Sequence, residues 1–212
     1  MFTNRQEAGQ KLIQKLLADR TNKELNNAVV LGVPRGGMIV AVEVAKGLKC
    51  QLDVIVTRKI GAPGNQELAV GAVGETEGSK YLNQNLIKDL GVSVEYLGQE
   101  IENQQREIKR REKIYRQGRS ALDLNNKTAI IVDDGAATGA TLIAACREVW
   151  NNHPKRVMIA LPVAPEETVK KLEEEADEVE VLETPEPFFS VGQFYREFGQ
   201  VEDEEVIKIL RN

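Results

Sequence analysis

Two adjacent carboxylates stand beside a run of very small residues in the middle of the chain. Asp133 and Asp134 follow the apolar run 129–132, and the segment 135–141 after them contains only glycine, alanine and threonine. Small residues at a strand-to-helix turn let backbone N–H groups approach a ligand, and a helix N-terminus attracts an anion. Threonine hydroxyls add further donors. We therefore expect this segment to bind a phosphate group.

The two carboxylates would repel that phosphate, so they need another partner. We expect Asp133 and Asp134 to accept hydrogen bonds from sugar hydroxyls or to face Mg²⁺. The alternative is a strand capped by aspartate, with small residues that serve only helix-on-sheet packing. The segment is not a Walker A loop, because the lysine of that motif is missing. The sequence predicts a site for a phosphorylated sugar.

Alternating strands and helices are expected to position this site. Apolar runs predict strands at 28–33, 52–57, 68–73, 129–132, 156–161 and 179–182, with 68–73 and 179–182 at or near a sheet edge and 61–65 as a loop. Helical patterns occupy 4–19, 38–46, 84–90, 94–117, 141–150, 165–176 and 203–211. This alternation predicts an α/β fold with a doubly wound, mainly parallel sheet.

Three turns at the ends of predicted strands carry residues that could bind a ligand. They are Pro34–Gly37, Thr57–Lys59 and Asp133–Thr141. In doubly wound sheets, ligands bind outside the carboxyl ends of the strands, so the three turns should converge on one rim. The alternatives are a surface turn that happens to contain arginine and a charged strand exit.

The central segment resembles a known family signature. V-D-D-G-A-A-T-G-A-T is similar to the phosphoribosyl-diphosphate (PRPP) motif of type I phosphoribosyltransferases. The segments G-V-P-R-G-G, V-T-R-K-I-G-A-P-G-N-Q-E-L-A-V-G-A-V and P-E-P-F-F-S-V-G-Q-F-Y-R-E-F extend the likeness over most of the chain. Together they resemble one group of bacterial phosphoribosyltransferases whose acceptors are largely unassigned.

The resemblance implies a role for each matching residue. It assigns the ribose hydroxyls of PRPP to Asp133 and Asp134. It assigns the 5′-phosphate to Ala137, Thr138, Gly139, Ala140 and Thr141. It assigns the diphosphate to Arg35, Gly36, Gly37, Arg58 and Lys59. Asp133, Asp134, Arg58 and Lys59 are the expected catalytic residues, and Mg²⁺ is expected to arrive with the diphosphate.

Five aromatic residues gather near the C-terminus, at Phe188, Phe189, Phe194, Tyr195 and Phe198. In this family such a segment can form a hood that stacks an acceptor base. Alternatively, the five rings could seal a core or the interface of a homodimer.

Composition narrows the function classes. The 212 residues are expected to form a single domain, 1–212, and a net charge of −5 argues against a nucleic-acid partner. No apolar run approaches the roughly 20 residues of a membrane span, and no signal peptide opens the chain, so we expect a cytoplasmic protein without a membrane partner. Cys50 and Cys146 should be buried free thiols, and His153 should be a solvated loop residue. No protein-built metal site is expected.

Three functions remain open at this stage. The leading hypothesis is an enzyme that transfers the phosphoribosyl group from PRPP to a small heterocyclic nitrogen acceptor and releases diphosphate. The second is a non-catalytic regulator that senses PRPP or a nucleotide on the same fold. The third is a hydrolase that acts on phosphorylated sugars.

Overall fold

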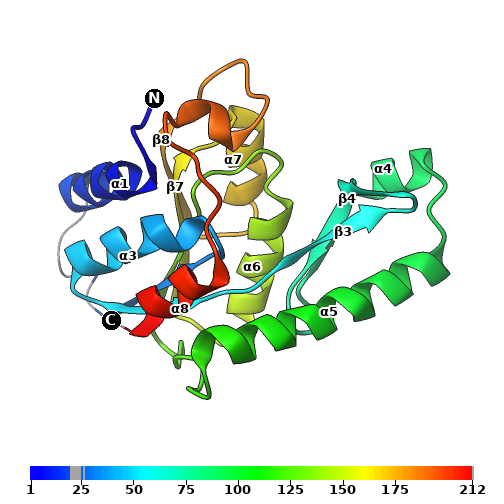
Figure 1. Ribbon diagram of the computed structural model, residues 1–212, viewed down its shortest axis with the longest axis horizontal. Coiled ribbons are helices and arrows are strands. Elements are labelled where there is room, and N and C mark those ends of the chain that lie inside the picture. The colour runs from blue at the N-terminus through cyan, green and yellow to red at the C-terminus, as the bar shows by residue number, and fades with distance from the viewer. Residues whose placement is uncertain (20–24, 26, 212) are drawn as a thin grey trace.

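The centre of the molecule is a five-stranded parallel sheet (Figure 1). The computed structural model describes residues 1–19, 25 and 27–211. In spatial order the strands are β2 (Gln51–Val54), β1 (Ala28–Gly32), β6 (Thr128–Val132), β7 (Arg156–Val163) and β8 (Glu178–Glu183). Each neighbouring pair is parallel. The predicted α/β class is confirmed, and β8 lies at the expected edge.

Helices cover both faces of this sheet. One face carries α1 (Arg5–Asp19) and α3 (Gly37–Leu48), and the other carries α6 (Ala140–Trp150) and α7 (Glu166–Glu173). The doubly wound arrangement follows from strands that are apolar on both sides, because each side then needs a helix to exclude water.

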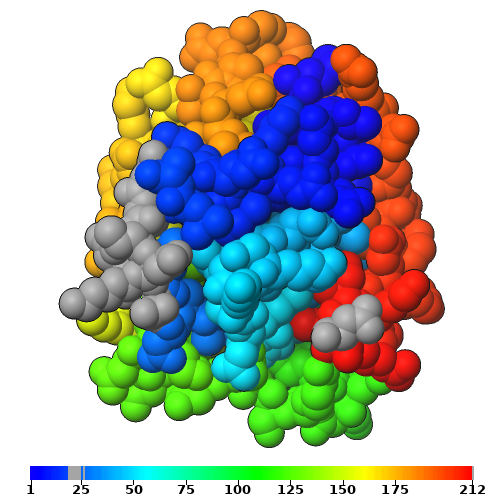
Figure 2. Space-filling view, turned by 90° about the vertical axis from the view of Figure 1, so that its left-hand side faces the viewer, coloured from blue at the N-terminus to red at the C-terminus, as the bar shows by residue number. Residues whose placement is uncertain are grey.

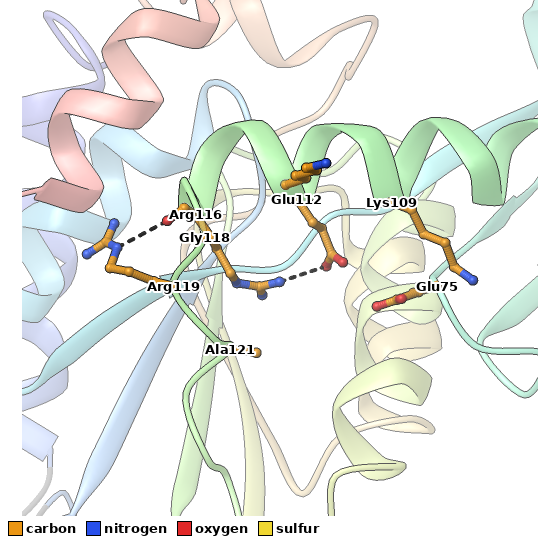
Figure 3. Close-up of a pocket in the computed structure, with 8 residues that line it drawn as sticks. Glu75, Lys109, Glu112, Arg116, Gly118, Arg119 and Ala121 are labelled. Carbon is orange, nitrogen blue, oxygen red and sulfur yellow. Dashed lines mark hydrogen bonds and ion pairs between the residues drawn. The ribbon is translucent and has the colours of Figure 1, made fainter.

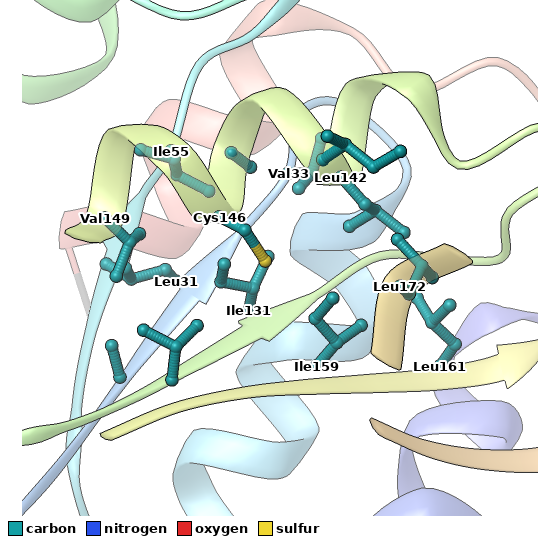
Figure 4. Close-up of a cluster of buried hydrophobic side chains, with 14 of the residues drawn as sticks. Leu31, Val33, Ile55, Ile131, Leu142, Cys146, Val149, Ile159, Leu161 and Leu172 are labelled. Carbon is teal, nitrogen blue, oxygen red and sulfur yellow. The ribbon is translucent and has the colours of Figure 1, made fainter. Parts of the chain in front are cut away.

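Neighbouring residues of β6 show how the core divides. Ile130 packs with Leu12 of α1 and Val40 of α3. Ile131 points to the opposite face and packs with Leu142 and Cys146 of α6 (Figure 4). Strand residues alternate between faces. Burial of each such side chain contributes about 1.5–3 kcal/mol, which fixes the strand register and hence the position of Asp133.

A second, antiparallel sheet forms an arm that projects from the main body (Figure 1). Its order is β3 (Arg58–Ala62), β4 (Asn65–Val73) and β5 (Lys80–Leu82). The helices α4 (Gln84–Asp89) and α5 (Val94–Arg116) complete the arm.

The arm corrects three boundaries expected from the sequence. The predicted strand 52–57 ends at Val54, and the predicted loop 61–65 contains the end of β3 and a hairpin turn. The strand predicted at the edge of the main sheet is β4, the central strand of the second sheet. A Cβ at Gly61 would lie 2.7 Å from the Cα of Gln66, so this glycine permits close strand pairing.

The long helix α5 covers the arm with an apolar stripe. Leu97, Ile108 and Tyr115 are buried against Ile60 and Val70. In the basic cluster 109–111, Lys109 and Arg110 are exposed and Arg111 is partly buried, and Arg110 and Arg111 both donate to Glu107.

The N-terminal residues pair with the segment that precedes α8. The backbone N–H of Phe2 donates to Phe194 at 2.8 Å, and that of Arg196 donates to Phe2 at 2.9 Å. Figure 2 shows the N-terminal segment beside the C-terminal one. The latter contains the 3₁₀ turn η1 (Val191–Phe194) and α8 (Asp203–Arg211).

The remaining expectations from composition concern exposed or reactive side chains. Cys146 is buried, whereas Cys50 is only partly buried, and both thiols are free. Burial raises the pKa of Cys146 to about 12. His153 is exposed in a turn. Over the ranges that the structure describes, every helix is too short or too polar to cross a bilayer.

Candidate active site

A cavity of about 1,230 Å³ opens beyond the carboxyl ends of β1 and β6. It brings together the turn 34–36, the pair Thr57 and Lys59, and the segment 133–141. These segments are far apart in the sequence, and the parallel sheet joins them as expected.

The acidic pair lies in this cavity and is held by the N-terminal helix. Arg5 Nε donates to Asp134 Oδ2 at 2.6 Å, with side-chain exposures of 11% and 14%. Asp133 Oδ1 accepts from the backbone N–H of Asp134 at 2.8 Å. Burial raises the pKa of both carboxyls. The charge of Asp134 raises the pKa of Asp133 further, whereas Arg5 opposes the rise at Asp134.

The turn after β1 lies in direct contact with these carboxylates. A Cβ at Gly37 would lie 2.6 Å from Asp133 Oδ1, and one at Gly36 would overlap Asp134 Oδ2. A Cβ at Gly37 would also lie 2.8 Å from the Cα of Asp133, so glycine is required there, whereas at Gly36 the neighbouring atoms belong to the side chains of Asp134 and Arg5. The Pro34–Arg35 peptide is cis. Arg35 Nη1 lies 3.2 Å from Glu202 Oε2, so its guanidinium is shared with the segment that leads into α8.

The expected phosphate segment leads into the N-terminus of α6. Gly139 has φ of 77°, a left-handed conformation that favours glycine. The first N–H groups of a helix lack intrahelical acceptors and can therefore bind an anion. The cavity is lined by all five residues assigned to this role: Ala137, Thr138, Gly139, Ala140 and Thr141.

Helix α7 supports this segment through a residue that the sequence did not indicate. Thr168 Oγ1 donates to the carbonyl oxygen of Ala137 at 2.6 Å. Thr168 is 2% exposed. Its contact partner lies 31 residues earlier in the chain, and no local motif distinguishes Thr168 from other helical threonines.

Arg58 and Lys59, the two cations expected at the diphosphate, point in different directions in the structure. Arg58 is half-buried and its Nε donates to Gln104 Oε1 of α5 at 2.9 Å. Burial lowers the pKa of Arg58. Lys59 is exposed and lines the cavity, whereas Arg58 does not line it. Consecutive side chains of an extended segment point to opposite faces, so in this structure Lys59 faces the cavity and Arg58 faces α5.

The C-terminal aromatics divide between the two roles considered for them. Tyr195 and Phe198 pack in the body: the Tyr195 hydroxyl donates to the carbonyl oxygen of Asp134 at 2.6 Å, and Arg5 lies 3.7 Å from the centre of the Phe198 ring. Phe188 and Phe189 instead line the cavity. Phe189 is 83% exposed and is available to a ligand.

The arm supplies the facing wall of the cavity. Leu68, Tyr81, Asn83 and Leu86 line it from β4, β5, the N-cap of α4 and α4 itself. Leu68 lies in a segment that carries the family resemblance but received no role there, and Tyr81, Asn83 and Leu86 lie outside those segments. All four reach the cavity through the fold of the second sheet.

A second cavity, of about 260 Å³, lies below the C-terminal half of α5 (Figure 3). Its charges are engaged with one another. Arg116 Nη1 lies 3.3 Å from Glu112 Oε1 and its Nε lies 3.1 Å from Asp53 Oδ1, while Arg119 Nε donates to the carbonyl oxygen of Arg116. It offers no helix N-terminus and no glycine-lined approach comparable with those of the large cavity, so the large cavity is the candidate active site.

Comparison with known proteins decides the family. Residues 4–195 match the family model described as the phosphoribosyl transferase domain. The chain belongs to this phosphoribosyl transferase family. The resemblance noted in its central motif is thereby confirmed.

Two curated relatives from Mycobacterium tuberculosis, strains CDC 1551 and H37Rv, carry names that describe a "Putative phosphoribosyl transferase". Each is 42% identical to the chain over 210 residues. The match covers 99% of the phosphoribosyl transferase chain but only 46% of each relative, so the chain spans about half of their length.

Solved structures support the fold. The crystal structure of TT1426 from Thermus thermophilus is 41% identical, with a TM-score of 0.80 and coverage of 99% of this chain and 97% of that one. A purine phosphoribosyltransferase from Pyrococcus horikoshii is 21% identical, with a TM-score of 0.51 and coverage of 92% and 93%. The second likeness concerns the fold alone.

Proposed function

We propose that the chain transfers the 5-phosphoribosyl group from PRPP to a ring nitrogen of a small heterocyclic base. One observation carries the proposal: a single cavity holds the N-terminus of α6, the acidic pair and the glycine turn pressed against that pair. A phosphate, a ribose and a diphosphate require these three kinds of surface side by side.

Each part of PRPP binds the surface of the cavity that suits its charge. The first turn of α6 and the hydroxyls of Thr138 and Thr141 bind the 5′-phosphate. Asp133 and Asp134 accept hydrogen bonds from the ribose hydroxyls. The backbone of Arg35 and Gly36 and the ammonium of Lys59 bind the diphosphate, and Gly37 lets this turn lie close to Asp133. Binding at both ends positions the reacting ribose carbon between them.

The reaction exchanges one bond at that carbon. The bond from C1 to the diphosphate oxygen breaks and its electron pair leaves with the diphosphate. The acceptor nitrogen forms the new bond with its lone pair, and its proton passes to solvent. Negative charge grows on the leaving group, so the cation at Lys59 stabilises the transition state more than the ground state. The resemblance assigned this role to Arg58 as well, but Arg58 faces α5.

Mg²⁺ suits this site as a companion of the ligand. The described residues contain no group of three or more His, Cys, Asp or Glu side chains able to hold a metal. Mg²⁺ is commonly bound by one or two carboxylates together with substrate phosphates, and Asp133 and Asp134 can supply the carboxylates. When bound, the ion neutralises charge on the diphosphate.

A diphosphate-release assay tests the proposal. Mg²⁺ and PRPP are incubated with the protein and a panel of nucleobases and other small heterocycles, and release is compared with that of Asp133→Asn. Acceptor-dependent release that the variant lacks supports transfer. PRPP binding without release for any acceptor would favour the non-catalytic sensor, and release without an acceptor would favour the hydrolase.

A further inference from the structure

One buried hydroxyl in the cavity wall has no partner. Thr57 is 8% exposed, and its Oγ1 is the buried side-chain polar atom that lacks a hydrogen-bond partner in the part of the chain that the structure describes. Buried polar groups are almost always paired, and an unpaired one lowers the stability of the fold. A ligand atom that is present only in the working complex would explain this exception.

The backbone places the Thr57 side chain at the wall of the cavity. Thr57 lies between β2 and β3 in a segment whose neighbouring side chains point to opposite faces. Val56 and Arg58 face the arm and α5, where Val56 joins the apolar cluster and Arg58 donates to Gln104. Thr57 and Lys59 both line the large cavity.

The polar groups of the two cavity-lining residues of this segment have no protein partner. Along the described chain, the Lys59 ammonium has neither a hydrogen bond nor an ion pair, and Thr57 Oγ1 has no partner. A cation attracts an anion, and a hydroxyl beside it can donate to one of that anion's oxygens. The two groups together form a small subsite for an anionic oxygen.

The choice of residue type points the same way. Val54, Ile55 and Val56 precede Thr57. Valine at position 57 would keep the β-branched shape and would remove the unpaired hydroxyl, so packing alone favours valine. The hydroxyl therefore lowers the stability of the ligand-free protein, which is typical of groups retained for binding.

We infer that Thr57 Oγ1 donates a hydrogen bond to a diphosphate oxygen of the sugar donor, next to the ammonium of Lys59. The inference rests on the proposed function. It adds one residue to those that the family motif assigns to the diphosphate. It also predicts that Thr57 contacts the diphosphate and does not contact the 5′-phosphate.

The test compares Thr57→Val, which removes only the hydroxyl, with Thr57→Ser, which keeps it. Thr128→Val is the matched control, because Thr128 is also buried but begins β6, at the end remote from the cavity. Melting temperatures are measured without ligand. Calorimetry then gives Kd for Mg²⁺–PRPP, for inorganic diphosphate with Mg²⁺, and for a nucleoside 5′-monophosphate.

Thr57→Val should melt higher than the wild type and bind PRPP and inorganic diphosphate about tenfold more weakly, with the monophosphate unchanged. Thr57→Ser should bind all three like the wild type, and Thr128→Val should leave every Kd unchanged. Wild-type Kd values for PRPP and diphosphate in Thr57→Val would overturn the inference while the proposed function stood. An equal loss for the monophosphate would overturn it too.

If the wild type does not bind PRPP, the proposed function fails. The inorganic diphosphate titration then still decides whether Thr57 contributes to an anion subsite. Failure of the wild type to bind diphosphate as well would overturn both.

Discussion

Arg5 Nε lies 2.6 Å from Asp134 Oδ2 across 129 residues of sequence. The same guanidinium donates to the carbonyl oxygen of Gly199 at 2.8 Å and lies over the Phe198 ring. Asp134 is therefore paired directly with a cation of α1, whereas Asp133 forms no ion pair within the described residues and feels Arg5 only at longer range. The two neighbouring carboxylates should respond differently to mutation.

Replacing Arg5 should shift the pH dependence of binding. Without the guanidinium, burial would raise the pKa of Asp134 further, so Arg5→Met should bind PRPP weakly at neutral pH and recover as the pH rises. Loss of one partner of a buried pair should also lower the free energy of unfolding by about 3 kcal/mol. Arg5→Lys should restore part of the PRPP affinity at neutral pH and part of the lost stability. Calorimetry from pH 6 to 9 checks this, and an unchanged pH profile would contradict it.

Asp133→Asn should stabilise the ligand-free protein while it weakens PRPP binding. The pKa of Asp133 is raised in the fold, so the folded protein holds a proton that the unfolded chain loses, and stability falls as the pH rises through the folded pKa. Asparagine removes this loss and can still accept from the N–H of Asp134. Asp134→Asn should instead destabilise, because Arg5 loses its partner. Melting curves at pH 7 distinguish the two, and equal shifts would refute the assignment.

Lys59→Ala should weaken ligand binding, whereas Arg58→Ala should mainly lower the stability of the fold. Loss of the Lys59 ammonium should weaken PRPP by about 1.5–3 kcal/mol and leave a nucleoside monophosphate nearly unchanged, because only PRPP carries the diphosphate. Arg58→Ala should mainly lower the melting temperature through its lost bond to Gln104. Titration of both ligands against both variants provides the measurement. A selective PRPP loss at Arg58 would restore the role expected from the motif.

Thr141→Val tests the opposite end of the ligand. Removing its hydroxyl should leave a phosphate oxygen poorly paired and weaken PRPP and the monophosphate alike by about 1–3 kcal/mol. The Kd values of Thr168→Val can be compared with those of Thr141→Val. Thr168 acts on the phosphate segment only indirectly, through its hydrogen bond from α7 to the carbonyl oxygen of Ala137. A loss confined to PRPP at Thr141 would mean that the ligand lies in the reverse direction.

Glu112 should contribute to stability below neutral pH. Burial, opposed by Arg116 and aided by Glu75, raises the pKa of Glu112 to about 7. The folded state then binds a proton that the unfolded state has lost, so stability should decline between about pH 4.5 and 7. Glu112→Gln should flatten that decline. Denaturant unfolding at several pH values measures it, and an identical slope in the variant would contradict the assignment.

The sequence indicates the parts of the site that are contiguous. Asp133 to Thr141 could be predicted because strand, acids and small residues follow one another in a single motif. The contacts of Arg5, Thr168 and Tyr195 with this motif could not be predicted, since their partners lie 31 to 129 residues away in the sequence. The first two strands of the arm were misplaced because charged Arg58 and Lys59 concealed the start of β3. Without that boundary, the sequence did not show that Arg58 points toward α5 while Lys59 points into the cavity.

The pairing of residues 2–5 with residues 194–199 has a consequence during protein synthesis. The acidic pair leaves the ribosome well before Tyr195, Phe198 and Gly199, which hold Asp134 and Arg5 in the finished fold. A nascent chain can therefore close the hydrogen bonds of its central strands while its ligand site is still incomplete. The ability to bind the sugar donor should arise only after Tyr195 and Phe198 have been made and have reached α1.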